Sequence, residues 1–272
     1  ADYGIVPGLN LHWVWDGPLA ERAISGDPPV VRRYSAEERA ELAGSLSNDG
    51  WQAIKLRLHH ETIAEDIRTV EMARDAVGDG MTITVDANQA ESNGTWQPGI
   101  QWDYRRAADT ALVMQDLGVY WLEEPLRGFE FDQLAQLNAS VRMPIAGGEG
   151  LTGLHDFFRA CQQNVYDILQ PEVLVLHGLT AMRKVGTLAE FHGKQIVPHN
   201  GGGNLGVIAH LHLVASWRHA PFLEILHDPP IGDYMQGFSI MKNPPIVDSD
   251  GLISVPQGPG LGVEIDHDLI KT

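Results

Sequence analysis

The stretch MTITVDAN, residues 81–88, decides the fold, because an apolar run with strand character ends in a carboxylate and is followed by a polar loop. The same arrangement recurs twice. The three stretches and their acidic residues are ITVDANQ with Asp86, VYWLEEPL with Glu123 and MPIAGGEG with Glu149. A parallel α/β sheet places its chemistry at this end of its strands. Oxygen ligands from neighbouring strands suit an octahedral Mg²⁺ ion better than Zn²⁺, so the sequence predicts a Mg²⁺ enzyme.

The strand pattern WQAIKLRL, residues 51–58, carries two cations on one face. Lys55 and Arg57 share that face with Ala53, since side chains alternate along a strand. Strands of an all-parallel sheet are usually apolar on both faces, so charge that faces inward needs partners. We expect convergent carboxylates to supply them.

Apolar strand patterns alternate with helical patterns along most of the chain. The first strand is expected from Leu9 to Trp15, and the first helix after Ser35, with Glu38 completing a capping box. Eight such strands over about 215 residues predict an α/β fold, a closed (β/α)8 TIM-type barrel. The expected divisions are a leader or linker remnant at 1–8, the catalytic barrel at 9–256, and an irregular tail at 257–272 that packs on the barrel.

Composition limits the partners of the chain. It has 272 residues, 43% of them hydrophobic, and a formal net charge of -17. Such a charge repels nucleic acid and anionic lipid, so neither is expected as a partner. Cys161 is the single cysteine, and the chain has neither a signal-peptide pattern nor an apolar run long enough for a bilayer. These features favour a cytoplasmic protein.

The motifs at the strand ends carry a family resemblance. They are KLR, VDANQ, WLEEP, GGE, QPE, VPHN and FLE, in this order, followed by GPGLGVEID in the tail. Over roughly Leu9 to Asp266 the chain resembles the barrel domain of the enolase superfamily, mandelate racemase subgroup. Such proteins carry an N-terminal α+β capping domain, which is expected from the family but not present in this chain.

The resemblance implies a role for each motif residue. The Mg²⁺ ligands would be Asp86, Glu123 and Glu149. The acid/base dyad would be His199 with Glu172, where the family usually has Asp. Lys55 and Arg57 would be the pair on the second strand, with Arg57 standing where some members have a second Lys. Glu224, Asn88 and His59 are the candidate substrate contacts.

The family's shared step is removal of the proton α to a carboxylate, and the handling of that proton distinguishes the possible reactions. His199 is the best base, because imidazole titrates near neutral pH, whereas the Arg57 guanidinium stays protonated. Racemisation needs acid/base groups on both faces of the carbon, but elimination of water can use His199 alone. We therefore favour a hydro-lyase that converts a sugar acid, a small carboxylate, to a 2-keto-3-deoxy acid.

Other functions stay open. The chain could be a racemase, epimerase or cycloisomerase of the same superfamily, or a catalytically inactive barrel that lacks its cap. The resemblance also implies a homo-oligomer.

Overall fold

The computed structural model describes residues 4–9, 12–14, 30–32, 35–58, 60–90, 100–200, 204–227 and 233–270. Eight strands form one sheet in the order β10-β1-β4-β5-β6-β7-β8-β9, and each described pairing in it is parallel. The strands are β1 (Gly4–Leu9), β4 (Ala53–Arg57), β5 (Thr82–Asp86), β6 (Leu122–Glu123), β7 (Ile145–Gly147), β8 (Ile168–Leu169), β9 (Gln195–Ile196) and β10 (Phe222–Ile225). The predicted α/β fold with a parallel sheet is confirmed.

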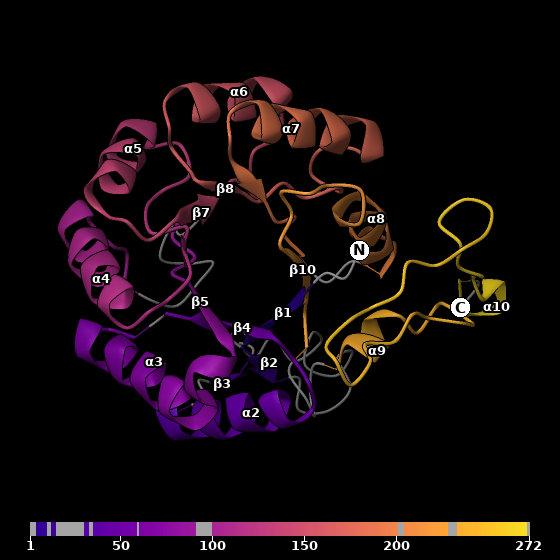
Figure 1. The fold of residues 1–272 in the computed structure, drawn as a ribbon, viewed down its shortest axis with the longest axis horizontal. Helices are drawn as coiled ribbons and strands as arrows, with labels where there is room; N and C mark the ends of the chain where they lie inside the picture. The colour runs from indigo at the N-terminus through magenta and orange to yellow at the C-terminus, as the bar shows by residue number, and fades with distance from the viewer. Residues whose placement is uncertain are drawn as a thin grey trace.

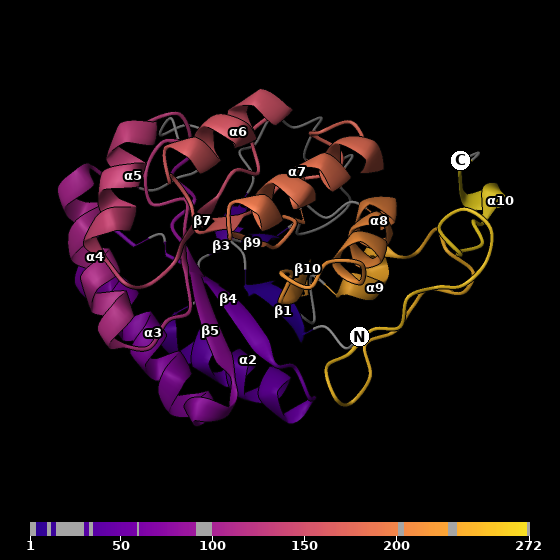
Figure 2. The same ribbon diagram turned by 45° about the horizontal axis from the view of Figure 1, so that its top comes forward.

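Helices cover the outside of this sheet in a ring (Figures 1 and 2). They are α2 (Ala36–Asn48), α3 (Ile63–Val77), α4 (Tyr104–Asp116), α5 (Phe131–Ser140), α6 (Leu154–Gln162), α7 (Leu179–Phe191) and α8 (Asn204–Val214), and a 3-10 turn, η1 (Gly78–Gly80), follows α3. The predicted capping box at Ser35 and Glu38 is confirmed, and Thr62 with Glu65 forms a second one at α3. Each box satisfies backbone N–H groups that the first helical turn leaves without partners.

The two ends of the sheet order are also linked. The backbone N–H of Ile196 in β9 donates a hydrogen bond of 3.1 Å to the carbonyl of His219, shortly before β10 begins. None of the helices in the described part of the chain has the length and apolar content needed to cross a membrane.

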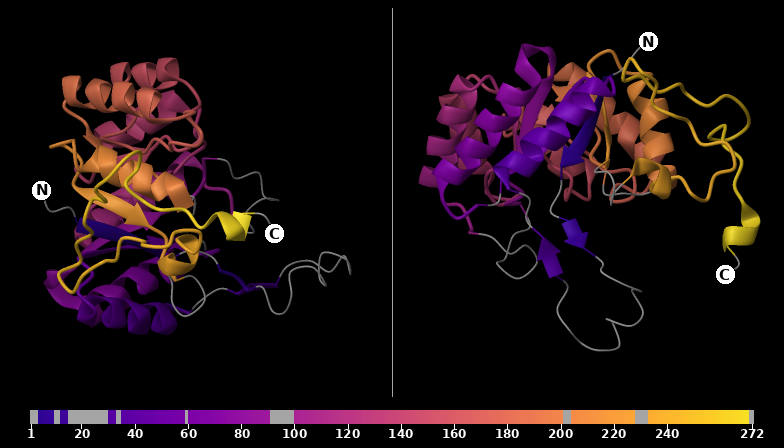
Figure 3. Two further views of the ribbon diagram at one scale, coloured as in Figure 1. Left: turned by 90° about the vertical axis from the view of Figure 1, so that its right-hand side faces the viewer. Right: turned by 90° about the horizontal axis from the view of Figure 1, so that it is seen from below.

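The predicted start of the sheet is wrong. β1 spans Gly4–Leu9, so most of the expected leader at 1–8 belongs to the sheet, between β10 and β4. Two glycines and a proline lower the strand propensity of this segment, but pairing with neighbours on both sides outweighs that preference. Within the expected strand from Leu9 to Trp15, Leu9 belongs to β1, whereas residues 12–14 form β2 (His12–Val14). β2 pairs antiparallel with β3 (Val30–Arg32) in a separate two-stranded sheet that projects from the ring (Figure 3).

The segment after β10 contains two short helices, α9 (Tyr234–Gly237) and α10 (His267–Ile270), and extends to one side of the ring (Figures 1 and 3). An isolated antiparallel bridge joins Met241 to Ile265. Met241 lies before the boundary expected between residues 256 and 257, and Ile265 lies after it. The tail therefore pairs with the segment that precedes it in the chain.

The inside of the ring is layered. An apolar layer is made by Ala53, Trp121, Ala146, Ile168 and Val197, with Tyr120 and Phe222 packed against it. Two residues after five of these positions the side chains are polar, and after Ala146 stands Gly148. The polar residues are Lys55, Glu123, Gln170, His199 and Glu224. Because side chains of one face recur at every second residue, the apolar layer forms a floor below the polar one.

Candidate active site

Lys55 lies at the centre of the polar layer and is only 3% exposed. Its Nζ is 3.0 Å from both carboxylate oxygens of Glu123, 2.5 Å from Glu224 Oε1 and 3.9 Å from Asp86 Oδ2. Burial alone would lower the pKa of Lys55, but the carboxylates of Glu123, Glu224 and Asp86 outweigh it and raise the pKa. The ammonium group is therefore a fixed positive charge. The prediction that inward-facing cations have carboxylate partners is confirmed for this residue.

Glu123 is completely buried and both of its oxygens accept hydrogen bonds. Besides Lys55, Trp121 Nε1 donates to Oε2 at 3.2 Å and Gln170 Nε2 donates to the same atom at 2.7 Å. Sequence reasoning missed Trp121 and Gln170 as contacts of a site residue. The signal was present, because each lies two residues before a predicted site residue and so shares its face of the strand.

Arg57 and Asp86 are adjacent on paired strands, and Arg57 Nη1 lies 3.0 Å from Asp86 Oδ2. The backbone N–H of Asn88 donates to Asp86 Oδ1 at 2.7 Å. Burial and the nearby Glu123 raise the pKa of Asp86 despite the Arg57 charge. Burial would lower the pKa of Arg57, but Asp86 and Glu149 outweigh it and raise the pKa, so the guanidinium stays charged.

His199 bridges two carboxylates. Its Nδ1 lies 3.4 Å from Glu172 Oε2, and its Nε2 lies 3.2 Å from Glu149 Oε2. The side chains of His199 and Glu149 are 20% and 21% exposed, whereas Lys55 and Asp86 are 3% and 1% exposed, so solvent reaches this pair more than it reaches Lys55 and Asp86. Burial would lower the pKa of His199, but Glu149 and Glu172 raise it to about 9. His199 thus lies beside a predicted metal ligand, because the segments after β7 and β9 bring their side chains to the same edge of the sheet.

Glu124, next to Glu123, is a buried carboxyl that sequence reasoning set aside. It has a positive φ of 45°, and its Oε1 has no hydrogen-bond partner among the described residues. Burial, followed by the charges of Glu149 and Asp86, raises its pKa well above the usual range. A small hollow lined by Gly148, Leu151 and Tyr166 lies beside it. The doublet in WLEEP was the only sequence signal for this position.

The predicted ligands fit a hard divalent cation in chemistry, although they do not stand as a formed coordination shell. Within the described part of the chain, no three His, Cys, Asp or Glu side chains lie close enough together to hold one metal ion. Glu123 is hydrogen-bonded to Lys55 and Gln170 instead. Asp86 Oδ2 is nevertheless buried and makes no hydrogen bond, although it is paired with the Arg57 charge at 3.0 Å. Asp86 and Glu149 each have a pKa raised by burial and by neighbouring carboxylates, to about 7 for Glu149. Such a cluster of buried carboxylates has a deficit of positive charge, which a cation would correct.

The remaining predicted contacts are placed as follows. Glu224 joins the polar layer through Lys55, and Asn88 follows Asp86 with its backbone N–H in the site. His59 lies outside the described residues.

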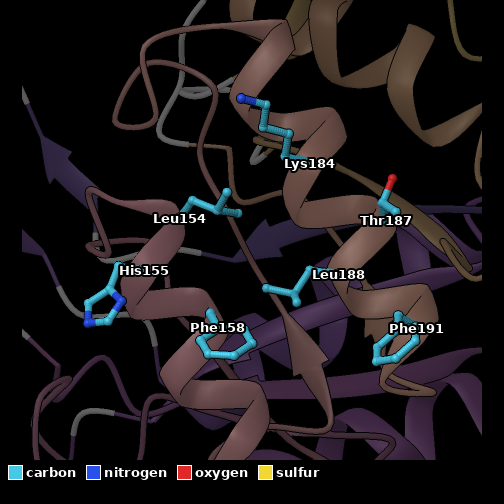
Figure 4. Close-up of a pocket in the computed structure, with 7 residues that line it drawn as sticks. All are labelled: Leu154, His155, Phe158, Lys184, Thr187, Leu188 and Phe191. Atoms are coloured by element: carbon cyan, nitrogen blue, oxygen red, sulfur yellow. The ribbon is translucent and has the colours of Figure 1, made fainter.

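A separate apolar groove of about 550 Å³ lies on the outside of the ring, between α6 and α7, with Leu154, Phe158, Leu188 and Phe191 among its walls (Figure 4). Its described lining has no carboxylate, so it is unrelated to this chemistry.

Comparison with known proteins agrees with the fold. The family described as "Enolase C-terminal domain-like" matches residues 37–269. The chain belongs to the enolase superfamily, as its C-terminal barrel domain, in the mandelate racemase and muconate lactonizing enzyme subgroup.

Relatives within this family differ in their reactions. The chain is 31% identical over 243 residues to D-galactarolactone cycloisomerase of Agrobacterium fabrum, covering 86% of this chain and 58% of that protein. It is 34% identical over 176 residues to L-talarate/galactarate dehydratase of Salmonella typhimurium, covering 65% of this chain and 40% of that protein. A crystal structure of an L-talarate/galactarate dehydratase variant with Mg and L-glucarate superposes with a TM-score of 0.76 at 25% identity, covering 99% of this chain and 57% of that one. The chain thus spans little more than half, or less, of these proteins.

Proposed function

We propose that the chain carries the catalytic site of a Mg²⁺-dependent hydro-lyase that removes the α-proton of a sugar acid and eliminates water to give a 2-keto-3-deoxy acid. The observation that carries the proposal is the pairing of His199 with Glu172, opposite two cations that stay charged, Lys55 and Arg57. Among the described residues of this layer, His199 is then the group whose ring nitrogen is suited to the proton transfer.

Each residue has a distinct part in this proposal. Asp86, Glu123 and Glu149 would hold Mg²⁺, which supplies positive charge for the enediolate oxygens. Lys55 would shift from Glu123 toward the substrate carboxylate, and Glu224 and Arg57 would orient the substrate. His199 Nε2 would take the α-proton and then deliver it to the departing 3-hydroxyl group, with Glu172 holding the imidazole.

Three less specific expectations accompany this proposal. We propose that the sheet closes into a (β/α)8 barrel, that the protein assembles as a homo-oligomer, and that it acts in the cytoplasm. The buried, free Cys161 is in keeping with a reducing compartment. The similarity to L-talarate/galactarate dehydratase supports a sugar acid as the substrate class.

A cycloisomerase is the second candidate, since one relative with that activity aligns with 86% of this chain. The two functions are separated by their products. The protein is incubated with a library of acid sugars and of their lactones in the presence of Mg²⁺. Formation of a 2-keto-3-deoxy acid from an open-chain acid sugar, with loss of water, supports the dehydratase, whereas opening of a lactone without loss of water supports the cycloisomerase.

A further inference from the structure

His210 lies on α8, fully buried behind the predicted dyad. Its Nε2 accepts a hydrogen bond of 3.0 Å from the backbone N–H of Val173, and the same nitrogen is 3.4 Å from Glu172 Oε1. Sequence reasoning gave this histidine no chemical role. It nevertheless contacts both the side chain of Glu172 and the backbone of the next residue.

The contact with Val173 fixes the protonation of the ring. A nitrogen that accepts an N–H cannot carry a proton, so the neutral ring of His210 has its proton on Nδ1. Nδ1 has no hydrogen-bond partner among the described residues, although it is buried. Burial lowers the pKa of His210 to about 4, which agrees with a neutral ring. His210 therefore acts as an acceptor and does not exchange protons with a substrate.

The two oxygens of Glu172 have different partners. Oε1 accepts the backbone N–H of Leu174 at 3.2 Å, and Oε2 faces His199 Nδ1. Val173 and Leu174 thus present successive N–H groups close to one carboxylate. Because His210 occupies the Val173 N–H, that group does not compete for Glu172, and Oε2 stays directed at His199.

The turn that carries Glu172 is also held by backbone hydrogen bonds. Its backbone carbonyl accepts the N–H of Leu176 at 2.9 Å, and the carbonyl of Pro171 accepts the N–H of His199 at 3.2 Å. A glutamate side chain has three rotatable torsions, so it needs fixed neighbours to hold one orientation. His210 supplies such a neighbour from the helix that packs behind the turn.

We propose that His210 is a positioning residue, which fixes the Val173 N–H and thereby keeps Glu172 Oε2 directed at Nδ1 of His199, the proposed base. The inference rests on the proposed function only for the role of His199 as the base. The orientation itself can be measured without any substrate.

The test compares three variants of His210 by ¹⁵N NMR of histidine-labelled protein, with the His199 signals assigned from their absence in His199→Asn. His210→Gln places an amide oxygen near the position of Nε2, so it can still accept the Val173 N–H. His210→Asn is polar but too short to reach it, and His210→Leu has no acceptor. His212→Gln is the matched control, because His212 lies two residues away on α8 and contacts the Leu261 carbonyl instead.

We expect His210→Gln and His212→Gln to retain the ¹⁵N shifts of the His199 ring. His210→Asn and His210→Leu should shift them, and should lower kcat by about tenfold to 100-fold with little change in KM. Unchanged His199 signals in folded His210→Asn would overturn the proposal, as would a His210→Gln variant as defective as His210→Asn. If His210→Leu does not fold, the comparison of His210→Gln with His210→Asn still tests the proposal. Failure of the wild type to turn over any acid sugar would affect the proposed function but not the NMR result.

Discussion

Lys55 Nζ lies 3.0 Å from each oxygen of Glu123, so one buried ammonium spans the carboxylate that the family resemblance gives to the metal. If Glu123 holds Mg²⁺ as proposed, Lys55 and the ion would draw on the same negative charge. The metal affinity would then depend on Lys55, which is not itself a proposed metal ligand.

Replacing Lys55 by Met should therefore lower the stability of the metal-free protein and increase its response to Mg²⁺. Glu123 and Glu224 would be left buried without their shared cation, which costs about 3 to 5 kcal/mol. The free energy of unfolding, measured in urea with and without Mg²⁺, tests this. Lys242→Met is the control, since Lys242 and Glu264 form an exposed pair that contributes little. An equal Mg²⁺ response in wild type and Lys55→Met would contradict the competition.

Asp86→Asn and Glu149→Gln should each weaken Mg²⁺ binding and abolish turnover. Each change removes one anionic oxygen ligand from a hard cation. Calorimetric titration with Mg²⁺ measures the affinity directly. Glu190→Gln, on the exposed side of α7, serves as the control. Wild-type affinity in both Asp86→Asn and Glu149→Gln would remove these residues from the metal site.

His199→Asn should stop both dehydration and exchange of the substrate α-proton with D₂O, while Mg²⁺ still binds. Removal of an imidazole that lies 3.2 Å from Glu149 leaves that carboxylate to the metal, so the affinity should not fall. Glu172→Gln should show a milder loss, because it removes the group that orients the base rather than the base. Deuterium content of recovered substrate, measured by NMR, is the readout. Persistent incorporation in His199→Asn would place the base elsewhere.

Asp66, on α3 and away from the site, should make stability depend on pH. Burial raises its pKa from 3.8 to about 6, although the His60 N–H and Arg106 donate to it at 3.1 Å and 2.5 Å. The folded protein therefore binds this proton more tightly than the unfolded chain, and the stabilisation present below pH 3.8 is lost as the pH rises through about 6.

Asp66→Asn removes this titration. Relative to wild type, the variant should gain up to roughly 3 kcal/mol between pH 4 and 7, measured by urea unfolding at several pH values. Asp109→Asn, at an exposed carboxylate on α4, should show no such trend. Parallel pH profiles for Asp66→Asn and wild type would refute the assignment.

Local signals in the sequence predicted the elements whose ends are set by nearby residues. Ser35 and Glu38 lie three residues apart, so the start of α2 could be predicted from the sequence. The segment Gly4–Leu9 could not, since its strand conformation comes from pairing with β10 and β4, which are distant in the chain. Non-local pairing of this kind leaves little trace in a short stretch rich in glycine and proline.

In the candidate site, too, local patterns could be predicted and contacts across the ring could not. Alternation along strands predicted that Lys55 and Arg57 face carboxylates, and the motif order predicted which residues meet at one edge of the sheet. The partner of each oxygen could not be predicted, because the choice of Glu123 between Lys55, Gln170 and a metal depends on angstrom-scale distances across the ring. The contact of His210 could not be predicted for a related reason. The sequence of an apolar helix does not indicate which loop a histidine on it will contact.

The apolar floor below Lys55 fills the ring on that side of the polar layer with packed side chains. The rings of Trp121 and Phe222 in it lie 5.9 Å apart. The His199 and Glu149 side chains are more exposed than those of Lys55 and Asp86. Under the proposed function, a substrate would therefore approach Lys55 from the side of His199 and Glu149, and the product would leave by the same side.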